Sequence, residues 1–220
     1  MHCFINVLEI IGTISFSISG AMLGKKRNMD LFGVCVMGVI TACGGGVLRD
    51  LFLGKLPPSA FCTPIYPIMA IVASVVIFLS SSQTLFAHKK QFYKTIMFFA
   101  DSVGLGIFTV MGVSVALATE YGTNIPFVVF LGVITGVGGG VFRDILAGET
   151  PYIFVKHIYA CATIAGALVC VATLNIVGEP IAMLLGGISV ISIRIFAAYF
   201  KWNLPKPKAY EETELYISRH

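Results

Sequence analysis

The sequence predicts an all-α membrane protein with seven transmembrane helices, arranged as two inverted three-helix repeats plus a seventh helix. Composition is the first reason: of the 220 residues, 57% are hydrophobic and 12% are charged, whereas an average soluble domain carries about 25% charged residues. The mean hydropathy of +0.90 agrees with this. The second reason is that the apolar residues fall into runs of membrane-crossing length, and the third is a long motif that occurs twice.

The apolar runs have the ~17–25 residues that a helix needs to cross a hydrocarbon core. They are Phe4–Gly24, Leu31–Leu53, Pro64–Ser80, Ile96–Ala118, Pro126–Ala147, His157–Ile176 and Pro180–Phe200. We therefore expect a single transmembrane domain over residues 1–204 and a cytoplasmic tail over residues 205–220. The first run lacks a preceding basic region and a small-residue cleavage site, so we interpret it as a span and not as a cleavable signal.

Basic residues predict the orientation of the chain. Most of them follow the first, third and seventh runs, which share one side of the membrane if there are seven spans: Lys25, Lys26, Arg27, Lys89, Lys90, Lys94, Lys201, Lys206 and Lys208. The connection over residues 121–125 has no basic residue. By the positive-inside rule, the N-terminus is outside and the C-terminus is cytoplasmic. This distribution explains the net charge of +4 better than a nucleic-acid partner does, and we expect none.

A seventeen-residue motif occurs twice. Residues 38–54 read GVITACGGGVLRDLFLG and residues 132–148 read GVITGVGGGVFRDILAG, with eleven identical positions. We expect repeat one over about residues 4–82, repeat two over about residues 95–176, and the seventh helix over about residues 180–200.

The match extends beyond the motif in both directions. Upstream, Glu9 aligns with Asp101, and Gly12, Phe16 and Gly20 have counterparts at 104, 108 and 112; downstream, Ile-Tyr at 65–66 recurs at 158–159. Each copy thus has three spans, so the second enters the membrane from the opposite side. In transporters with this inverted plan, the transport path lies at the repeat interface near the midplane.

Each motif contains three consecutive glycines in the interior of a span. Glycine costs roughly 0.5–1 kcal/mol in a helix relative to alanine, so a triplet predicts a kink or an unwound turn. The carbonyl groups of such a turn can replace part of a cation's hydration shell. The alternative is helix packing, because small residues at a spacing of four let helices approach. The candidate pore and kink residues are Gly44, Gly45, Gly46, Gly138, Gly139, Gly140, Thr41 and Thr135.

An Arg-Asp pair follows each triplet inside the apolar run. An arginine at the centre of a span costs about 2.5–3.5 kcal/mol on insertion scales, so these residues should face the bundle interior or water. Counted along the spans, an acidic residue of the preceding helix lies at about the same depth in the membrane as each arginine. We predict two polar clusters, Glu9, Arg49 and Asp50 toward the outside and Asp101, Arg143 and Asp144 toward the inside. They are either the two mouths of a permeation path or charge pairs that hold helices together.

The remaining residues exclude several functions. The sequence has no arrangement of a nucleophile with a base and no metal-ligand spacing, so we expect no enzyme, no metal site and no cofactor. Arg194 is the one charge within the seventh run, and we expect it to bind a lipid headgroup or a neighbouring subunit. Tyr199 and Trp202 are typical of residues that anchor a helix at the membrane interface.

The duplicated GGGVxRD motif, with Glu9 and Asp101 upstream and Ile-Tyr downstream, resembles the prokaryotic members of the trimeric intracellular cation channel (TRIC) family. This family is also catalogued as a bacterial glycine-transporter domain in two copies, and the resemblance covers roughly residues 4–200. It implies a homotrimer in the bacterial inner membrane, surrounded by lipid, in which each subunit has a pore for monovalent cations, chiefly potassium. The kinked second and fifth helices would shape that pore. The family pattern has aspartate in both copies, where this sequence has Glu9.

The resemblance also implies a rival function, the transport of glycine or another small neutral solute. A zwitterion site would need an arginine or a helix N-terminus for the carboxylate, and an acidic group or carbonyls for the ammonium group. Arg49 or Arg143 with the nearby carboxylates meets this need. A channel and an alternating-access carrier use the same symmetric scaffold, so the sequence leaves both open. A third possibility is a scaffold that only trimerises and binds lipid.

Overall fold

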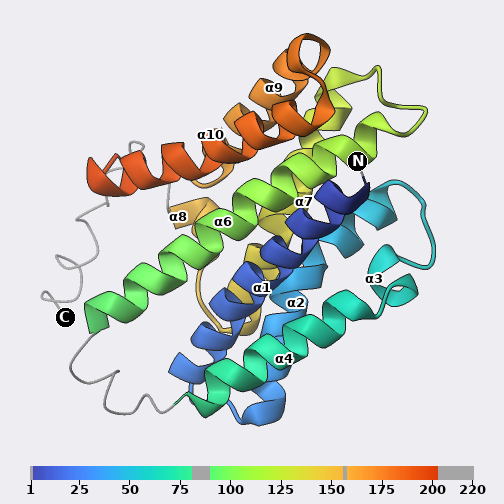
Figure 1. Ribbon diagram of the computed structural model, residues 1–220. Helices are drawn as coiled ribbons and strands as arrows, with labels where there is room; N and C mark the ends of the chain where they lie inside the picture. The colour runs from blue at the N-terminus through green and yellow to red at the C-terminus, as the bar shows by residue number, and fades with distance from the viewer. Residues whose placement is uncertain (1, 81–89, 156–157, 203–220) are drawn as a thin grey trace, which may run out of the picture.

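The computed structural model describes residues 2–80, 90–155 and 158–202, and these residues form helices joined by short connections (Figure 1). The expected tail and His157 lie outside the described residues. The helices are α1 (His2–Lys26), α2 (Leu31–Phe52), α3 (Ser59–Cys62), α4 (Ile65–Leu79), α6 (Lys90–Leu117), α7 (Ile125–Leu146), α8 (Tyr152–Val155), α9 (Ala160–Val177) and α10 (Glu179–Tyr199).

Six helices in the described chain are long and apolar enough to cross a membrane: α1, α2, α6, α7, α9 and α10. The remaining expected span is the shorter apolar helix α4, with 15 residues. Large apolar side chains cover the outside of the bundle, and Val76 on α4, Ile176 on α9 and Ile188 on α10 are all more than half exposed. A soluble monomer rarely exposes so much apolar surface. The chain is therefore an integral membrane protein, and its membrane fold agrees with the prediction.

Local sequence signals set the ends of α2 and α7. The Asp30 carboxylate accepts a hydrogen bond from the Gly33 N–H (2.7 Å), and the Asn124 side chain accepts one from the Phe127 N–H (3.2 Å). Both interactions cap the first turn of a helix. At the other end, Gly54 and Gly148 each follow the helix with a φ of +65°, a left-handed conformation that glycine adopts without strain.

The first helices of the two copies lie next to each other and run in opposite directions (Figure 1). Figure 1 shows α1 and its counterpart α6 side by side, with α1 running from the N-terminal end of the bundle and α6 running toward that end. α4 packs on α1 and α2, and α9 packs on α6 and α7. α10 packs on α6 and α9 at the edge of the bundle, which is where a helix outside the repeated core is expected (Figure 1).

The centre of the bundle is the crossing of α2 and α7 at the glycine triplets. A Cβ atom on Gly45 would overlap the carbonyl oxygen of Thr135, and a Cβ atom on Gly139 would overlap that of Thr41. The two contacts are equivalent, because Gly45 and Gly139 occupy the same position in the two copies of the motif, and so do Thr41 and Thr135. The backbones of α2 and α7 thus touch at two points where only glycine fits, and each helix contributes one of the two glycines.

The expectation of an unwound turn at the triplets is wrong. Both helices are α-helical without interruption, α2 over Leu31–Phe52 and α7 over Ile125–Leu146. The middle glycines have a packing role, since they form the closest approach between the two helices. A bend that keeps the helical hydrogen bonds stays a prediction.

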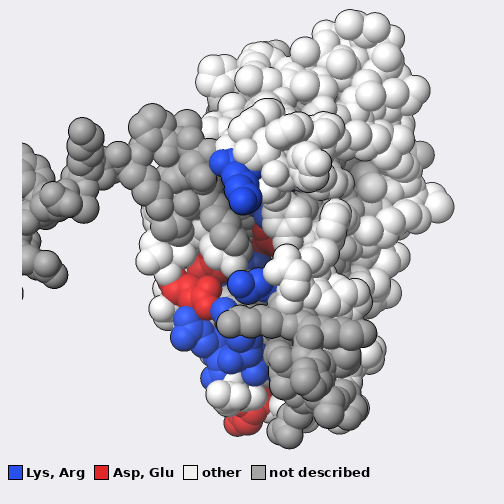
Figure 2. Space-filling model, turned by 90° about the vertical axis from the view of Figure 1, so that its left-hand side faces the viewer, with Lys and Arg blue, Asp and Glu red and all other residues white. Residues whose placement is uncertain are grey.

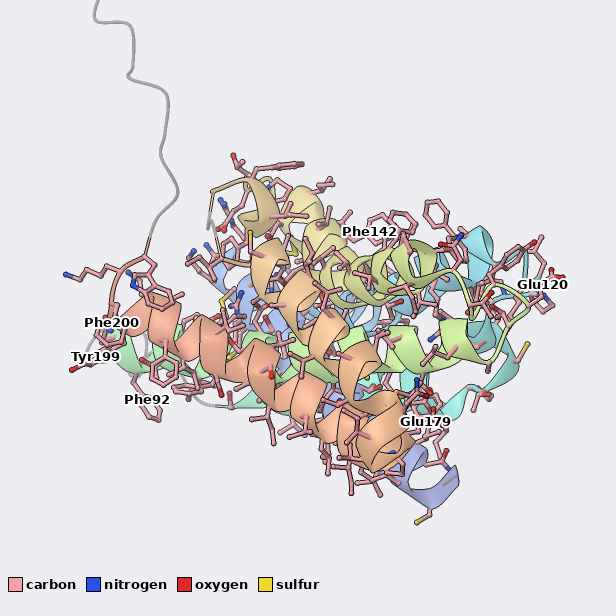
Figure 3. All side chains as sticks on the ribbon, turned by 90° about the horizontal axis from the view of Figure 1, so that it is seen from above. Phe92, Glu120, Phe142, Glu179, Tyr199 and Phe200 are labelled. Carbon is pink, nitrogen blue, oxygen red and sulfur yellow. The ribbon has the colours of Figure 1, made fainter. Side chains whose placement is uncertain are left out.

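Charged and aromatic side chains gather at the end where α1 and α10 finish and α6 begins. Figure 2 views this side and shows Lys, Arg, Asp and Glu in a band on a mostly white surface. Lys26 and Arg27 pair with Glu149 at 3.2 and 2.9 Å. Figure 3 shows Tyr199 and Phe200 at this end and Glu120 at the opposite one.

Glu149 lies outside the membrane-spanning helices and titrates in the field of two cations. Partial burial raises the pKa of its carboxyl, but the hydrogen bond to Lys26 and the charges of Lys26 and Arg27 outweigh burial, so the pKa lies below its ordinary value. A depressed pKa in the folded state means that this pairing stabilises the fold at neutral pH and is lost as the pH falls through that pKa.

Alanine substitutions in the first triplet test the crossing. Gly45→Ala should lower the free energy of unfolding by about 1–3 kcal/mol, because the new methyl group overpacks the contact with Thr135. The matched control is Gly46→Ala on the same helix, where the new methyl group would meet Arg49 Nη2 at 3.8 Å, an ordinary contact. The measurement is thermal unfolding in detergent. Equal melting temperatures for the two variants would contradict the crossing.

Candidate functional site

A cavity of about 460 Å³ enters the bundle at the end that holds the N-terminus. Helices α1, α2, α4 and α6 form its walls together with α3, and its polar lining comprises Asn6, Glu9, Thr13, Arg49, Ser59, Thr63 and Tyr66. Asn6 and Ser59 are exposed, so the cavity opens at the surface. Ala42, Gly46, Phe108 and Met111 contribute its deeper lining. The cavity therefore belongs mainly to repeat one and reaches the glycine triplet of α2.

Asp50 ties the end of α2 to the short helix α3. Its Oδ1 accepts a hydrogen bond from Arg49 Nε (2.8 Å), and its Oδ2 accepts from both the N–H and the hydroxyl of Ser59, each at 2.7 Å. Repeat two contains the same arrangement, in which Asp144 Oδ1 accepts from Arg143 Nε and Oδ2 accepts from the Tyr152 N–H, both at 2.9 Å. In both copies the aspartate thus neutralises its arginine and anchors the following short helix.

The acidic residues of α1 and α6 each pair with a tyrosine. The Tyr66 hydroxyl donates a hydrogen bond to Glu9 Oε2, and the Tyr159 hydroxyl donates one to Asp101 Oδ1 (3.3 Å). The tyrosines occupy matching positions in the two repeats, but their surroundings differ. The Tyr159 hydroxyl would contact a Cβ atom on Gly140 at 2.5 Å, whereas in the described part of the chain no tyrosine comes within 4 Å of that position on Gly46. The second repeat is therefore filled where the first has a cavity.

Arg143 lies at the centre of the inner cluster and is fully buried. Its Nη1 donates hydrogen bonds to Asp101 Oδ1 and to Ser19 Oγ, both at 2.6 Å. Its Nη2 lies 2.8 Å from Asp144 Oδ1. The structure thus brings together Asp101, Arg143 and Asp144. It brings Glu9 and Arg49 to one cavity, and Asp50 pairs with Arg49 outside the cavity lining, although the described residues contain no ion pair between Glu9 and Arg49.

Arg194 of α10 joins the same inner cluster. Its Nη2 donates to Asp101 Oδ2 (3.0 Å) and its Nε donates to Ser102 Oγ (2.8 Å). The guanidinium carbon lies 4.5 Å from the ring centre of Tyr159 and 5.1 Å from that of Phe98. Arg194 is 5% exposed, so the expectation that it binds a lipid headgroup or a neighbouring subunit is wrong. It binds the acidic residue of repeat two.

Two phenylalanines stand between the cavity and the inner cluster. Phe108 lines the cavity, and its ring centre lies 5.3 Å from that of the buried Phe16. Phe16 is one turn from Ser19, which binds Arg143. The two rings are repeat counterparts, so they meet where the two copies meet. Phe108 thus gives the cavity apolar lining, and Phe16 packs against it.

Thr41 and Thr135 do not line the cavity. Their hydroxyls donate to the carbonyls of Met37 and Leu131, one turn earlier, at 2.6 Å, and both residues are buried. Each hydroxyl also packs against a glycine of the neighbouring helix. The bond to the local backbone satisfies both hydroxyls, and their place on a pore stays a prediction. Within the part of the chain that the structure describes, no cluster of candidate metal ligands is found.

Sequence reasoning did not assign a role to the tyrosines, to Ser59 or to the phenylalanine pair. The signal for the tyrosines and phenylalanines was the repeat itself, since aligned polar or aromatic residues at a repeat interface are brought together by the two-fold relation. Ser59 gave no such signal, because repeat two uses a main-chain N–H alone for the same bond.

Removing the buried charge of the inner cluster should destabilise the protein strongly. Asp101→Asn leaves Arg143 and Arg194 without their shared carboxylate, and breaking a buried pair costs about 3–5 kcal/mol. The matched control is Glu149→Gln, which removes a carboxylate from a partly exposed pair and costs about 1 kcal/mol or less. The measurement is the free energy of unfolding in detergent. If the two losses were equal, the inner cluster would not be a buried ion-pair network.

The sequence model of the glycine transporter family matches residues 6–82 and 98–175, one copy on each repeat. The chain is 38% identical over 202 residues to the inner membrane protein YadS of Escherichia coli (strain K12), covering 91% of this chain and 93% of that protein. It is also 30% identical over 199 residues to the membrane protein YvgT of Bacillus subtilis (strain 168), covering 90% and 94%. Both relatives are assigned to the UPF0126 group.

Solved structures of TRIC channels share the fold. One, from a study of conductance through TRIC cation channels, has a TM-score of 0.80 and 37% identity, covering 92% of this chain and 97% of that one. A prokaryotic TRIC channel crystallised in 0.5 M KCl has a TM-score of 0.83 and 32% identity, covering 93% and 100%. The duplicated family match, the full-length relatives and the shared fold agree, and the chain belongs to the trimeric intracellular cation channel (TRIC) family.

Proposed function

We propose that this protein is a monovalent cation channel, selective chiefly for potassium, with one pore in each subunit of a homotrimer. The cavity of repeat one is the outer vestibule of this pore. The path continues along α2 and α7 at the repeat interface and ends at the inner cluster. The solved relatives are described as cation channels, and the chain is not an enzyme.

The charge of the cavity is the observation that carries this proposal. Arg49 is neutralised by Asp50 at 2.8 Å. Glu9, in contrast, receives a hydrogen bond from the neutral phenol of Tyr66. Counted together, the formal charges of Glu9 and Arg49 in the lining and of Asp50, which lies behind Arg49, sum to minus one, next to a recess with low-dielectric walls. Such a recess concentrates cations and repels anions.

The arrangement described is a closed one. Below the vestibule, the Phe16 and Phe108 rings form an apolar barrier of the kind that gates channels by excluding water. Conduction requires these rings to separate. The crossing at Gly45 and Gly139 has no side chains that would hinder a movement of α2 against α7.

The alternative is a carrier for glycine or another small neutral solute. The observation in its favour is that Glu9 and Arg49 line the same cavity, because a zwitterion needs one group of each sign. The guanidinium of Arg49, however, already donates to Asp50 and Ser59. A substrate carboxylate would have to compete with both, so the cavity favours a cation over a zwitterion.

We propose that the N-terminus and the vestibule face the periplasm and that the end with Lys26 and Arg27 faces the cytoplasm. The basic band of Figure 2 supports this orientation through the positive-inside rule. Cation entry would then begin at the outer face.

Purified protein in planar bilayers with a potassium gradient tests the function. A channel gives discrete unitary currents that reverse near the potassium equilibrium potential. Labelled-glycine uptake into proteoliposomes is measured in parallel with the same preparation. Saturable uptake without unitary currents would establish the carrier instead, and the absence of both would leave a scaffold.

The vestibule charge has its own test. Glu9→Gln should lower the unitary potassium conductance roughly 2–5-fold at low ionic strength, with a smaller effect at high salt, because screening removes the field of a single charge. The matched control is Glu120→Gln at the same end of the bundle but outside the cavity lining (Figure 3). The conductance of the control should equal that of the wild type. A Glu9→Gln conductance that is unchanged at low salt would remove Glu9 from the permeation path.

A further inference from the structure

The acidic residues of the two repeats stand in different electrostatic surroundings. Glu9 of repeat one has a neutral partner, Tyr66, and lies on an open cavity. Asp101 of repeat two lies between two guanidinium groups, with Arg143 on Oδ1 at 2.6 Å and Arg194 on Oδ2 at 3.0 Å. The second cation, Arg194, comes from α10, which is not part of the repeat.

Arg194 changes the net formal charge of the inner cluster. In repeat one, Glu9 and Asp50 with Arg49 sum to minus one. In repeat two, Asp101 and Asp144 with Arg143 also sum to minus one, and Arg194 brings this inner cluster to zero. Without Arg194, the inner cluster would have the same charge as the vestibule.

We propose that Asp101 is a second cation-binding site of the pore and that Arg194 is a tethered cation that occupies it when the pore is closed. This inference rests on the proposed channel function. The permeant ion and the guanidinium compete for Asp101 Oδ2, so the inner mouth binds potassium only after Arg194 leaves. Arg194 is thus a gating residue supplied by α10, which lies outside the two repeats.

The contacts of Arg194 fit a docked group that can leave. Arg143 and Tyr159 already donate to Asp101 Oδ1, so the carboxylate keeps these partners when Arg194 withdraws. Arg194 itself is held by the carboxylate, one hydroxyl and two aromatic faces, all on α6 or just before α9. A cation moving away from Asp101 would carry the end of α10 with it.

The backbone of α10 approaches α6 closely two turns away from Arg194. A Cβ atom on Gly106 would lie 2.8 Å from the carbonyl oxygen of Gly187. This contact fixes the middle of α10, and a tilt about it moves the end that bears Arg194. The tilt uncovers Asp101 together with Tyr159, the residue that fills the space over Gly140.

Potassium currents of Arg194 variants test the proposal. Arg194→Gln should raise the open probability or the mean potassium current roughly threefold or more, because the inner site loses its competitor and regains a negative charge. Arg194→Lys keeps the charge but loses the planar contacts, so its current should lie between those of Arg194→Gln and the wild type. The matched control is Arg27→Gln, a paired and partly exposed cation at the same end, which should conduct as the wild type does.

Thallium, a dense substitute for potassium, gives a readout that does not depend on current. Crystals of Arg194→Gln soaked in thallium should show the ion on the Asp101 carboxylate, and wild-type crystals should show none there. The tethered-cation proposal is overturned if the wild type conducts and both Arg194→Gln and Arg194→Lys carry the same current as the wild type. It is also overturned if correctly folded Arg194→Gln binds no thallium at Asp101. If the wild type gives no unitary currents, the channel proposal fails, and the thallium comparison still decides whether Arg194 masks a cation site.

Discussion

The direct backbone contact between α2 and α7 is the constraint on which the rest of the structure depends. Because Gly45 faces the Thr135 carbonyl and Gly139 faces that of Thr41, the two helices approach to a distance that any side chain would prevent. This approach brings the ends of both repeats inward, so that each buried Arg-Asp pair lies beside the acidic helix of its own copy. It also presses Phe16 against Phe108. The polar groups and the barrier between them are consequences of one crossing.

The repeated core does not produce a symmetric path, and the tyrosines account for the difference. Tyr159 covers Gly140 and reaches Asp101, whereas Tyr66 binds Glu9 at the wall of an open cavity. The same sequence pattern thus supports a filled and an open arrangement, and a small change in side-chain position separates them.

Hydropathy and self-comparison predicted the spans and the repeat, because both are properties of the chain alone. The helix α6 begins at Lys90 and not at Ile96, since a helix can continue into water beyond its apolar run, where hydropathy gives no signal. The unwound turn was wrong because the cost of glycine was judged in one isolated helix, whereas the partner helix repays it by packing. The expected partner of Arg194 was wrong, because periodicity within α10 does not tell which neighbouring helix its polar side chain meets.

The seventh helix solves a problem that an inverted repeat creates. Two identical halves would give two identical negatively charged mouths, and a path that is open at both ends would leak. One end can be closed only by something that the repeat does not contain. α10 supplies this asymmetry as a single positive charge, buried against Asp101 and between two aromatic rings. A buried cation without Asp101 would cost several kcal/mol, so the position of Arg194 and the charge state of the inner mouth are linked. In the proposed channel, electrostatics would therefore close the inner end, whereas the outer end lacks the corresponding positive charge.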